Sequence, residues 1–443
     1  MRNTDTDAGN EALAWLEPAI RLANVPTLAC LLVQLTGDTG WIEGRFVPER
    51  TRGLDDNEDG GLPAEVQDEI RVAALDAIRA WRDGRPAALE DPDDALLCHI
   101  MGVSLGETIP IEYAPMIRQE LRLPDRRSAS IDSNVPAPEG FLAIIVGAGI
   151  SGICAAIEFR KAGIPYVILE RNIRPGGVWL ENRYPGAACD VPSHLYSFSF
   201  APGDWSRYFA GSREIQAYLE TLAVGEGVVP HIRFGEEVME ARYLDDSGLW
   251  EVDARAGDAI RTYRGNIVVS CVGAFNKPRL PAIPGLDSFR GASVHTARYP
   301  DAGLDLTGRD VVLIGNGASA MQVAPAVADM VKSLRIVMRT PQWVAPFPKF
   351  GQAIPDVLRR LMREVEPYRL WYRLRLSWAF NDKQHASLQI DPGWTERTDS
   401  INAINDAHRR GLTAYMQKEL GEAQGLLPVM LPDYPPFGKR MLL

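Results

Sequence analysis

Two short glycine-rich motifs carry the clearest chemistry in this sequence. Gly147, Gly149 and Gly152 form G-x-G-x-x-G directly after the apolar run Leu142–Val146. In this pattern the first glycine permits a tight turn, the second lets a phosphate approach the backbone, and the third lets a helix pack on the strand. A helix that begins near Ser151 would direct its positive N-terminus at a pyrophosphate. The motif therefore predicts a dinucleotide site.

A carboxylate follows the first motif at the place where dinucleotide-binding folds recognise ribose. Glu170 ends the second apolar run, YVILE, roughly 20 residues after Gly147, and a carboxylate there accepts hydrogen bonds from a ribose diol. The sequence RPGGVW then places two more glycines directly after this strand. We therefore expect Glu170 to bind the ribose of the same dinucleotide.

The second motif repeats this plan with one difference. Gly315, Gly317 and Ala320 form G-x-G-x-x-A after the run VVLI, and Ser319 falls at the start of the predicted helix. The second strand of this unit, SLRIVMRT, ends near Arg339 and not at an acid. A cation at this point favours the additional 2′-phosphate of NADP, which a carboxylate would repel. The second motif therefore predicts an NADP site.

Two strand–turn–helix–strand units, residues 141–171 and 308–340, must hold these motifs. Two such units predict an α/β protein with two Rossmann-like dinucleotide-binding domains. Apolar residues at helical spacing predict helices over 11–36, interrupted at Pro26, and over 63–82.

The rest of the first 140 residues completes this N-terminal extension. Residues 93–122 continue in the same helical style, so we expect a helical N-terminal extension without site chemistry. A Pro-, Ser- and Asp-rich linker is predicted over 123–140.

Composition excludes several classes of function. The 443 residues carry a net charge of −11, which argues against a nucleic-acid partner because phosphate binding needs a basic surface. No apolar run is long enough to span a membrane, and the first residues lack the features of a secretory signal. The five cysteines are scattered without a C-x-x-C pair, which indicates reduced thiols in the cytoplasm and no metal site.

The segments after the first motif resemble class B flavoprotein monooxygenases of the Baeyer–Villiger type. The FAD domains of that family carry GGVW followed by YPG-x-x-x-D, which stand here at 176–179 and 184–190. The resemblance implies a glutathione-reductase-like fold with FAD at the first motif and NADPH at the second. It implies that Asp190 lies near the isoalloxazine ring, and it adds three residues to the expected FAD site: Gly177, Trp179 and Tyr196.

A second segment, FRGASVHTARYP, resembles the fingerprint F-x-G-x-x-x-H-x-x-x-W-P of the same family. Its matching residues include Phe289, Gly291, His295 and Pro300. Tyr299 stands where the family usually has Trp, whereas the related N-oxygenating flavin monooxygenases have Tyr or Phe there. In the family this segment links the two domains and governs their relative motion, so we assign His295 no proton transfer.

The last residues, LPDYPPFGKRMLL, resemble the family segment in which Lys-Arg follows a YPFG-like turn. The resemblance places Lys439 beside the NADP 2′-phosphate and makes Arg440 the active-site arginine over the flavin, with Asp190 as its partner. N-oxygenating relatives lack this Asp-plus-Arg pair. The N-terminal extension and the sequence MRTPQW at 338–343 most resemble 4-hydroxyacetophenone monooxygenase and its relatives.

This resemblance implies a division of the chain and an incomplete FAD domain. We expect the chain to continue beyond residue 443, because MLL resembles the start of a return strand to that domain. The predicted parts are a helical extension (1–135), an incomplete FAD-binding domain (136–275), an NADP-binding domain (276–430) with a helical insertion (about 351–430), and the start of the return (431–443).

Three hypotheses for function remain open at this point. The first is an FAD- and NADPH-dependent monooxygenase that uses O2 to convert a small ketone, such as an aryl ketone, into an ester. The second is an N- or S-oxygenating flavin monooxygenase, supported by Tyr299. The third is an inactive, truncated nucleotide-binding fragment. In each case the apolar faces of the N-terminal helices predict a homodimer interface.

Overall fold

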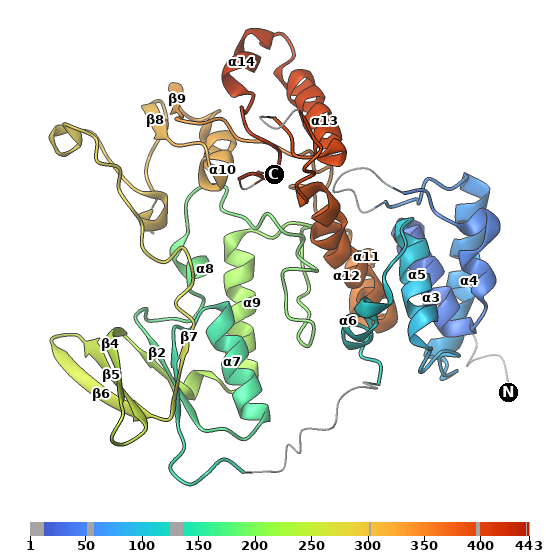
Figure 1. Cartoon of the computed structure of the whole chain (residues 1–443), viewed down its shortest axis with the longest axis horizontal. Helices are drawn as coiled ribbons and strands as arrows, with labels where there is room; N and C mark the ends of the chain where they lie inside the picture. The colour runs from blue at the N-terminus through green and yellow to red at the C-terminus, as the bar shows by residue number, and fades with distance from the viewer. Residues whose placement is uncertain are drawn as a thin grey trace.

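The computed structural model describes residues 13–50, 57–124, 136–300, 303–395, 399–439 and 441–442. Figure 1 shows a group of helices from the N-terminal part on one side and the sheets on the other, with residues 356–380 running between them. Most of the linker predicted over 123–140 lies outside the described residues.

The N-terminal extension is helical, as predicted. Its α-helices are α2 (Leu16–Leu22), α3 (Val25–Thr36), α4 (Ala64–Arg82), α5 (Asp94–Leu105) and α6 (Ala114–Glu120). The predicted interruption at Pro26 is a break between α2 and α3, and Pro26 lies in the first turn of α3, where its missing N–H costs nothing. Asn24 caps this helix by accepting a hydrogen bond from the Thr27 N–H at 3.0 Å.

The first dinucleotide motif lies in a four-stranded parallel sheet of order β3-β2-β1-β7. Two long helices, α7 and α9, lie against one face of this sheet, with the short α8 at its edge (Figure 1). The strands are β1 (Ala143–Val146), β2 (Tyr166–Glu170), β3 (Ile232–Phe234) and β7 (Ile267–Ser270), and the helices are α7 (Ile150–Lys161), α8 (Val178–Glu181) and α9 (Ser212–Gly225). Parallel strands put their carboxyl ends at one edge, so the glycine loop, Glu170 and the segment after β7 meet there.

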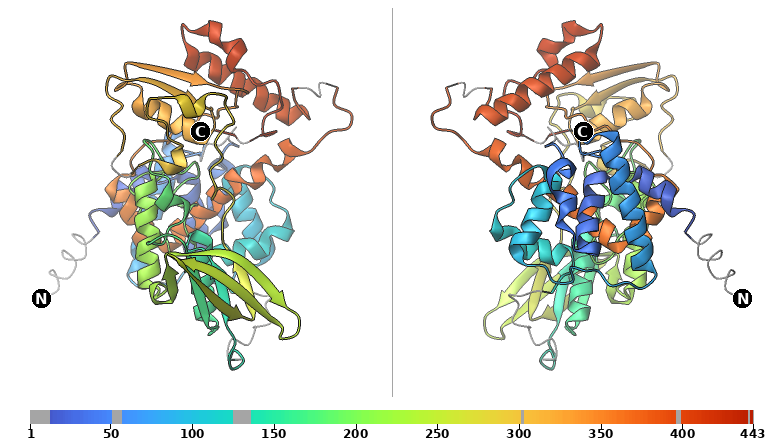
Figure 2. Two further views of the ribbon diagram at one scale, coloured as in Figure 1. Left: turned by 90° about the vertical axis from the view of Figure 1, so that its left-hand side faces the viewer. Right: turned by 90° about the vertical axis from the view of Figure 1, so that its right-hand side faces the viewer.

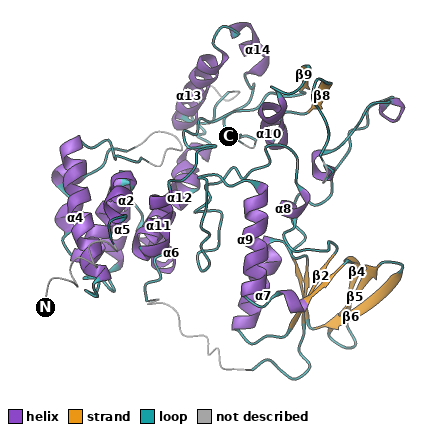
Figure 3. Ribbon diagram, turned by 180° about the vertical axis from the view of Figure 1, so that it is seen from behind, coloured by secondary structure: helices purple, strands orange, loops and turns teal. Residues whose placement is uncertain are grey.

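A three-stranded antiparallel sheet covers the other face of the parallel sheet. It consists of β4 (Glu236–Leu244), β5 (Leu249–Ala256) and β6 (Ala259–Gly265), in the order β4-β5-β6. Val252 and Ala254 of this sheet pack against Ile144, Val167 and Leu169 of the parallel strands. The two sheets stand together in Figure 3, opposite the N-terminal helices.

The second dinucleotide motif lies between β8 (Asp310–Ile314) and β9 (Ser333–Val337), which pair in parallel, and at the start of α10 (Ala318–Val327). The sequence predicted that the second strand ends near Arg339. In the structure β9 ends two residues earlier, at Val337. Val323 and Val327 of α10 face Leu313 and Leu334 of the strands in one apolar cluster.

The insertion after the second motif is helical, as predicted. It contains α11 (Asp356–Glu364), α12 (Glu366–Phe380), α13 (Ala403–Leu420) and α14 (Leu427–Met430). Short 3₁₀ helices complete the described secondary structure: η1 (Thr39–Ile42), η2 (Gly44–Phe46), η3 (Ile111–Tyr113), η4 (Val229–His231), η5 (Leu286–Ser288), η6 (Thr296–Arg298), η7 (Asp382–Leu388) and η8 (Gln424–Leu426).

Helix α12 packs against the N-terminal helices α3, α5 and α6, and the two side views of Figure 2 draw its orange segment at the height of the blue helices. The Trp371 indole donates a hydrogen bond to Gln34 Oε1 at 2.8 Å, and Tyr368 Oη accepts one from the Asn24 N–H at 2.8 Å. The buried Arg375 guanidinium donates to the Ser104 carbonyl oxygen at 3.1 Å. Residues more than 300 positions apart therefore share one core, which we call the joint core: Ala29, Cys30, Val33, Leu97, Ile100, Met101, Ile117, Leu370, Trp371, Leu374 and Trp378.

Two further expectations from composition can be compared with the structure. All five cysteines are free, as their spacing predicts, and burial raises the pKa of Cys30 to about 11. Within the described ranges, every helix is too short or too polar to cross a bilayer.

Candidate dinucleotide sites

The first candidate site is a groove of about 390 Å³ at the carboxyl edge of the parallel sheet. Its walls come from the glycine loop, the end of β2, the two glycines before α8, the start of β4 and the segment after β7. The residues that line it include Gly147, Gly149, Glu170, Asn172, Gly177, Trp179, Glu236, Cys271 and Lys277.

The glycine loop has the geometry that its spacing predicts. Gly147 has a φ of +101°, and a Cβ there would lie 2.8 Å from the Cys271 carbonyl oxygen. A Cβ on Gly152 would lie 1.9 Å from the Gly147 carbonyl oxygen, so α7 can approach the loop only with glycine at this position. Gly149 meets Gly177, whose Cβ would stand 3.0 Å from the Gly149 Cα. Two bare backbone segments thus face the groove, which suits a pyrophosphate.

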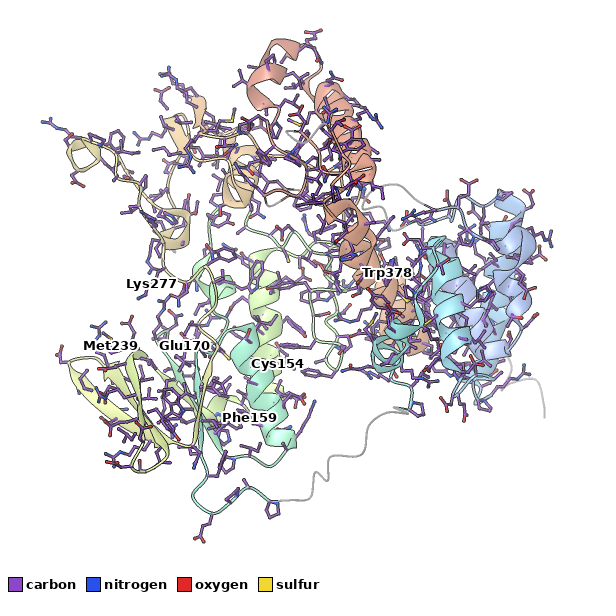
Figure 4. All side chains as sticks on the ribbon, in the orientation of Figure 1. Cys154, Phe159, Glu170, Met239, Lys277 and Trp378 are labelled. Atoms are coloured by element: carbon purple, nitrogen blue, oxygen red, sulfur yellow. The ribbon has the colours of Figure 1, made fainter. Side chains whose placement is uncertain are left out.

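Glu170 is buried at the base of the groove, and Figure 4 shows it across from Lys277 of the segment after β7. One carboxylate oxygen accepts a hydrogen bond from the Ala148 N–H at 2.7 Å, and the other accepts one from the Asn172 N–H at 2.8 Å. These two bonds fix the carboxylate plane, and each oxygen keeps acceptor capacity for a ribose hydroxyl. The position and chemistry of Glu170 therefore fit the predicted role.

Three further predicted flavin-site residues lie together beside the first groove. The Trp179 indole donates to Tyr196 Oη at 3.0 Å, and the two rings meet edge to face with centroids 5.6 Å apart. Burial raises the pKa of Tyr196, and the charge of the nearby Asp190 raises it further. The charge of Asp190 therefore acts on one member of the Trp179–Tyr196 pair expected at the FAD site.

The second glycine loop is more open than the first. Gly315 has a φ of +108°, and neither Gly315 nor Gly317 has a neighbouring atom within 4 Å of the place of a Cβ. Helix α10 begins directly after this loop, so the N–H groups of Ser319 and Ala320 lie in its first turn. Open space in front of a helix N-terminus fits a dinucleotide pyrophosphate.

The cations predicted for the 2′-phosphate are both exposed and belong to one structural unit. Arg339 follows the end of β9. Lys439 stacks on Tyr434 with its ammonium 4.2 Å from the ring centroid, and Tyr434 Oη donates to the Pro341 carbonyl oxygen at 3.0 Å. The turn that carries Lys439 is therefore fastened to the segment that carries Arg339.

In the fingerprint segment (residues 289–300), His295 has a structural role. His295 Nδ1 accepts a hydrogen bond from the Ala297 N–H at 3.1 Å and so caps η6. Tyr299 is half-buried against the cluster formed by Tyr184 and α10, whereas Phe289 is exposed and its ring lies over Gly291.

The last residues return toward the second unit. Arg440 lies outside the described residues. Leu442 pairs with Val344 in a parallel bridge, with its N–H bonded to the Trp343 carbonyl oxygen at 3.0 Å.

Several residues at the sites were not found from the sequence. Asn316 donates a hydrogen bond to the Thr340 carbonyl oxygen at 2.9 Å and so holds the second glycine loop to the segment after β9. Residues 271–277 line the first groove because β7 pairs with β1 in parallel. The apolar run of β7 was the available signal, but the pairing partner of a strand is not visible in its own residues.

Comparison with known proteins finds a match over the region that contains both glycine loops. Residues 142–350 match the family model described as flavin-binding monooxygenase-like. An uncharacterized monooxygenase of Sinorhizobium fredii is 44% identical over 427 residues, which are 96% of this chain and 64% of that protein. A Baeyer–Villiger monooxygenase of Streptomyces coelicolor is 38% identical over 301 residues, 68% of this chain and 54% of that protein. The chain thus spans less than two thirds of the length of these relatives.

Solved structures give the same result for the fold. A structure of OTEMO in complex with FAD and NADP matches with a TM-score of 0.56 and 26% identity, over 68% of this chain and 62% of that one. The open structure of cyclohexanone monooxygenase matches with a TM-score of 0.56 and 30% identity, over 68% and 64%. The prediction of an α/β fold with two Rossmann-like units is confirmed. Residues 142–350 are therefore similar to the flavin-binding monooxygenase-like family, and the relatives and solved structures that resemble the chain include Baeyer–Villiger monooxygenases and a complex with FAD and NADP.

Proposed function

We propose that this protein is an FAD- and NADPH-dependent monooxygenase that inserts one oxygen atom from O2 beside a ketone carbonyl and gives an ester. The observation that carries the proposal is the placement of residues 184–190, which contact α10 of the second unit and end at Asp190, whose charge acts on Tyr196, the hydrogen-bond partner of Trp179. This segment therefore connects α10 of the second unit with the surroundings of the Trp179–Tyr196 pair beside the first groove.

In this proposal the chain supplies binding and electrostatics, and the cofactors supply electron transfer and oxygen activation. The first glycine loop and Glu170 hold FAD, and the second loop with Arg339 and Lys439 holds NADPH. Arg440 provides a permanent cation near the reacting carbonyl, where it stabilises developing negative charge. Asp190 orients that guanidinium through a charge-assisted hydrogen bond.

The two other hypotheses have less support. N- or S-oxygenation rests on Tyr299 alone, and this side chain packs in an apolar cluster with Tyr184 and α10. The hypothesis of an inactive nucleotide-binding fragment rests on the incomplete FAD domain expected from the sequence, and the relatives reported above are described as monooxygenases. We further propose the domain boundaries given above, a cytoplasmic location, and a homodimer formed through the N-terminal extension.

Replacing Arg440 by alanine tests the proposed reaction in a form of the protein that oxidises a ketone. Ester formation should fall by about a hundredfold or more, since lost electrostatic stabilisation of this kind costs about 3–4 kcal/mol. NADPH should still bleach the flavin, because the variant leaves Gly315, Gly317 and Arg339 of the proposed NADPH site unchanged. Stopped-flow absorbance and product chromatography measure the two steps separately.

The Asp190→Ala variant serves as the graded comparison for Arg440→Ala. It should act in the same direction but more mildly, because the charge remains and only its orientation is loosened. Wild-type ester formation by Arg440→Ala would contradict the assignment. An N-oxide in place of an ester would contradict the proposed reaction class.

Replacing Arg339 by alanine tests the proposed cofactor preference. The apparent KM for NADPH should rise by about ten- to a hundredfold, because a hydrogen bond to a charged phosphate contributes about 1.5–3 kcal/mol. The KM for NADH, which lacks the 2′-phosphate, should change little. Arg335 is an exposed arginine of the neighbouring β9, so Arg335→Ala is the matched control. An unchanged ratio of the two KM values in Arg339→Ala would rule out this role.

A further inference from the structure

The segment that joins the two candidate sites offers one unusual backbone edge. Residues 187–189 run antiparallel to residues 210–212, with the Cys189 N–H bonded to the Ala210 carbonyl oxygen at 3.0 Å and the Ser212 N–H bonded to the Ala187 carbonyl oxygen at 2.8 Å. In such a pair the intervening residue, Ala188, directs its own N–H and C=O away from the partner strand. These two groups need partners from elsewhere.

The side chain of Gln322 on α10 supplies both partners. Its Nε2 donates to the Ala188 carbonyl oxygen at 2.9 Å, and its Oε1 accepts from the Ala188 N–H at 3.4 Å. The same Oε1 accepts a hydrogen bond from the Tyr184 hydroxyl at 2.8 Å. The Gln322 amide thus takes the place of a third strand, and its three bonds are compatible with one orientation of the amide group.

The backbone of α10 also meets the same segment directly. Gly186 has a φ of +77°, and a Cβ there would lie 2.3 Å from the Gln322 carbonyl oxygen. The Tyr184 ring packs in the apolar cluster with Val323 and Val327. Side-chain, backbone and apolar contacts therefore converge on one turn of the helix.

The contact between Gln322 and Ala188 connects the two candidate sites through few residues. Gln322 lies about one turn after the second glycine loop, and Ala188 lies two residues before Asp190. We propose that Gln322 is a positioning residue, which sets the place of the NADPH-binding loop relative to the flavin-binding segment. Because a misplacement of about 1 Å between reacting groups can lower a rate about a hundredfold, such a contact controls electron transfer between the cofactors. The proposal rests on the proposed function.

Two measurements on Gln322→Leu test the proposal in the whole chain. The first is hydrogen exchange of the Ala188 amide followed by mass spectrometry, which needs no cofactor. Exchange should accelerate by about tenfold, because the variant loses a hydrogen bond of ordinary strength, whereas amides of β1 keep their rates. The second is flavin bleaching by NADPH, whose limiting rate should fall by about tenfold while the Kd of NADP changes less than about threefold.

Two variants complete the design. Gln424→Leu is the matched control, because Gln424 also donates to backbone carbonyl oxygens, at 2.7 and 2.8 Å, but lies near α13 away from both sites. Tyr184→Phe removes only the hydroxyl that bonds Gln322 and decides the question if Gln322→Leu does not fold. It should lower the limiting rate by a smaller factor, about two- to fivefold, since it leaves the Ala188 bonds in place.

The outcomes separate the two proposals. Unchanged Ala188 exchange in Gln322→Leu, or an unchanged limiting rate beside faster exchange, overturns the positioning role. An equal loss of NADP affinity and limiting rate also overturns it, because this pattern indicates a damaged binding site. If the wild-type flavin is not bleached by NADPH, the proposed function fails, and the exchange result together with the NADP affinity still decides whether Gln322 positions the loop.

Discussion

Replacing Gly152 by alanine should abolish flavin binding. The new Cβ would lie 1.9 Å from the Gly147 carbonyl oxygen, a backbone atom that cannot rotate away. Helix α7 must therefore move away from the loop, and the N–H groups at its start no longer point at the pyrophosphate. Each lost hydrogen bond to a charged phosphate costs about 1.5–3 kcal/mol, so the loss of two lowers the affinity for FAD by more than about a hundredfold.

The flavin absorbance of the purified protein, followed by fluorescence titration with FAD, measures this effect. Gly225→Ala is the matched control, because Gly225 belongs to α9 in the same unit and has nothing within 4 Å of the place of a Cβ. The control should bind FAD as the wild type does. Both variants should keep a helical circular dichroism spectrum, because the N-terminal helices are unaffected. A Gly152→Ala protein with a full complement of flavin would show that the loop does not bind the pyrophosphate as proposed.

Removing residues 1–135 should leave an insoluble protein. The deletion uncovers the face of α12 that the joint core buries, including Trp371 and Leu374. Exposing each large apolar side chain costs about 1.5–3 kcal/mol, and several together approach a whole folding stability of about 5–15 kcal/mol. The deletion also removes the hydrogen bonds of the buried Arg375 to Asn24, Thr27 and Ser104, so its charge loses three partners.

Solubility on expression and analytical sedimentation measure this outcome. A point variant gives the same test in the whole chain, since Trp371→Ala should lower the free energy of unfolding by about 3–5 kcal/mol. Val72→Ala is the control, because Val72 is exposed on α4 and should change little. A soluble, folded deletion protein would contradict the joint core. If it were also a monomer where the whole chain is a dimer, the proposed homodimer interface would gain direct support.

The first dinucleotide site could be predicted closely because its signals are local. The spacing of Gly147, Gly149 and Gly152 fixes the loop, and the apolar run before it fixes β1. The predicted helix start near Ser151 differs from the observed start at Ile150 by one residue. A loop of this kind is specified by steric requirements of residues next to one another, so its geometry follows from the sequence.

The contacts between distant parts of the chain could not be predicted. Nothing in Gln322 or its neighbours indicates that its amide completes the edge at Ala188, because that edge exists only after residues 187–189 and 210–212 have paired. The end of the second strand was placed too late for a related reason. Residues 338–340 continue a β-compatible pattern, but the pairing of β8 with β9 ends at Val337, where Asn316 binds the segment that follows.

The joint core also sets an order of events during synthesis. The Asn24 N–H and its partner Tyr368 lie 344 residues apart, and the N-terminal helices leave the ribosome long before α12. At a synthesis rate of about 5–20 residues per second, roughly 17–70 seconds pass before the segment that covers their apolar faces has been made. We therefore expect the nascent N-terminal part to be a client of holding chaperones until residues 366–380 are synthesised.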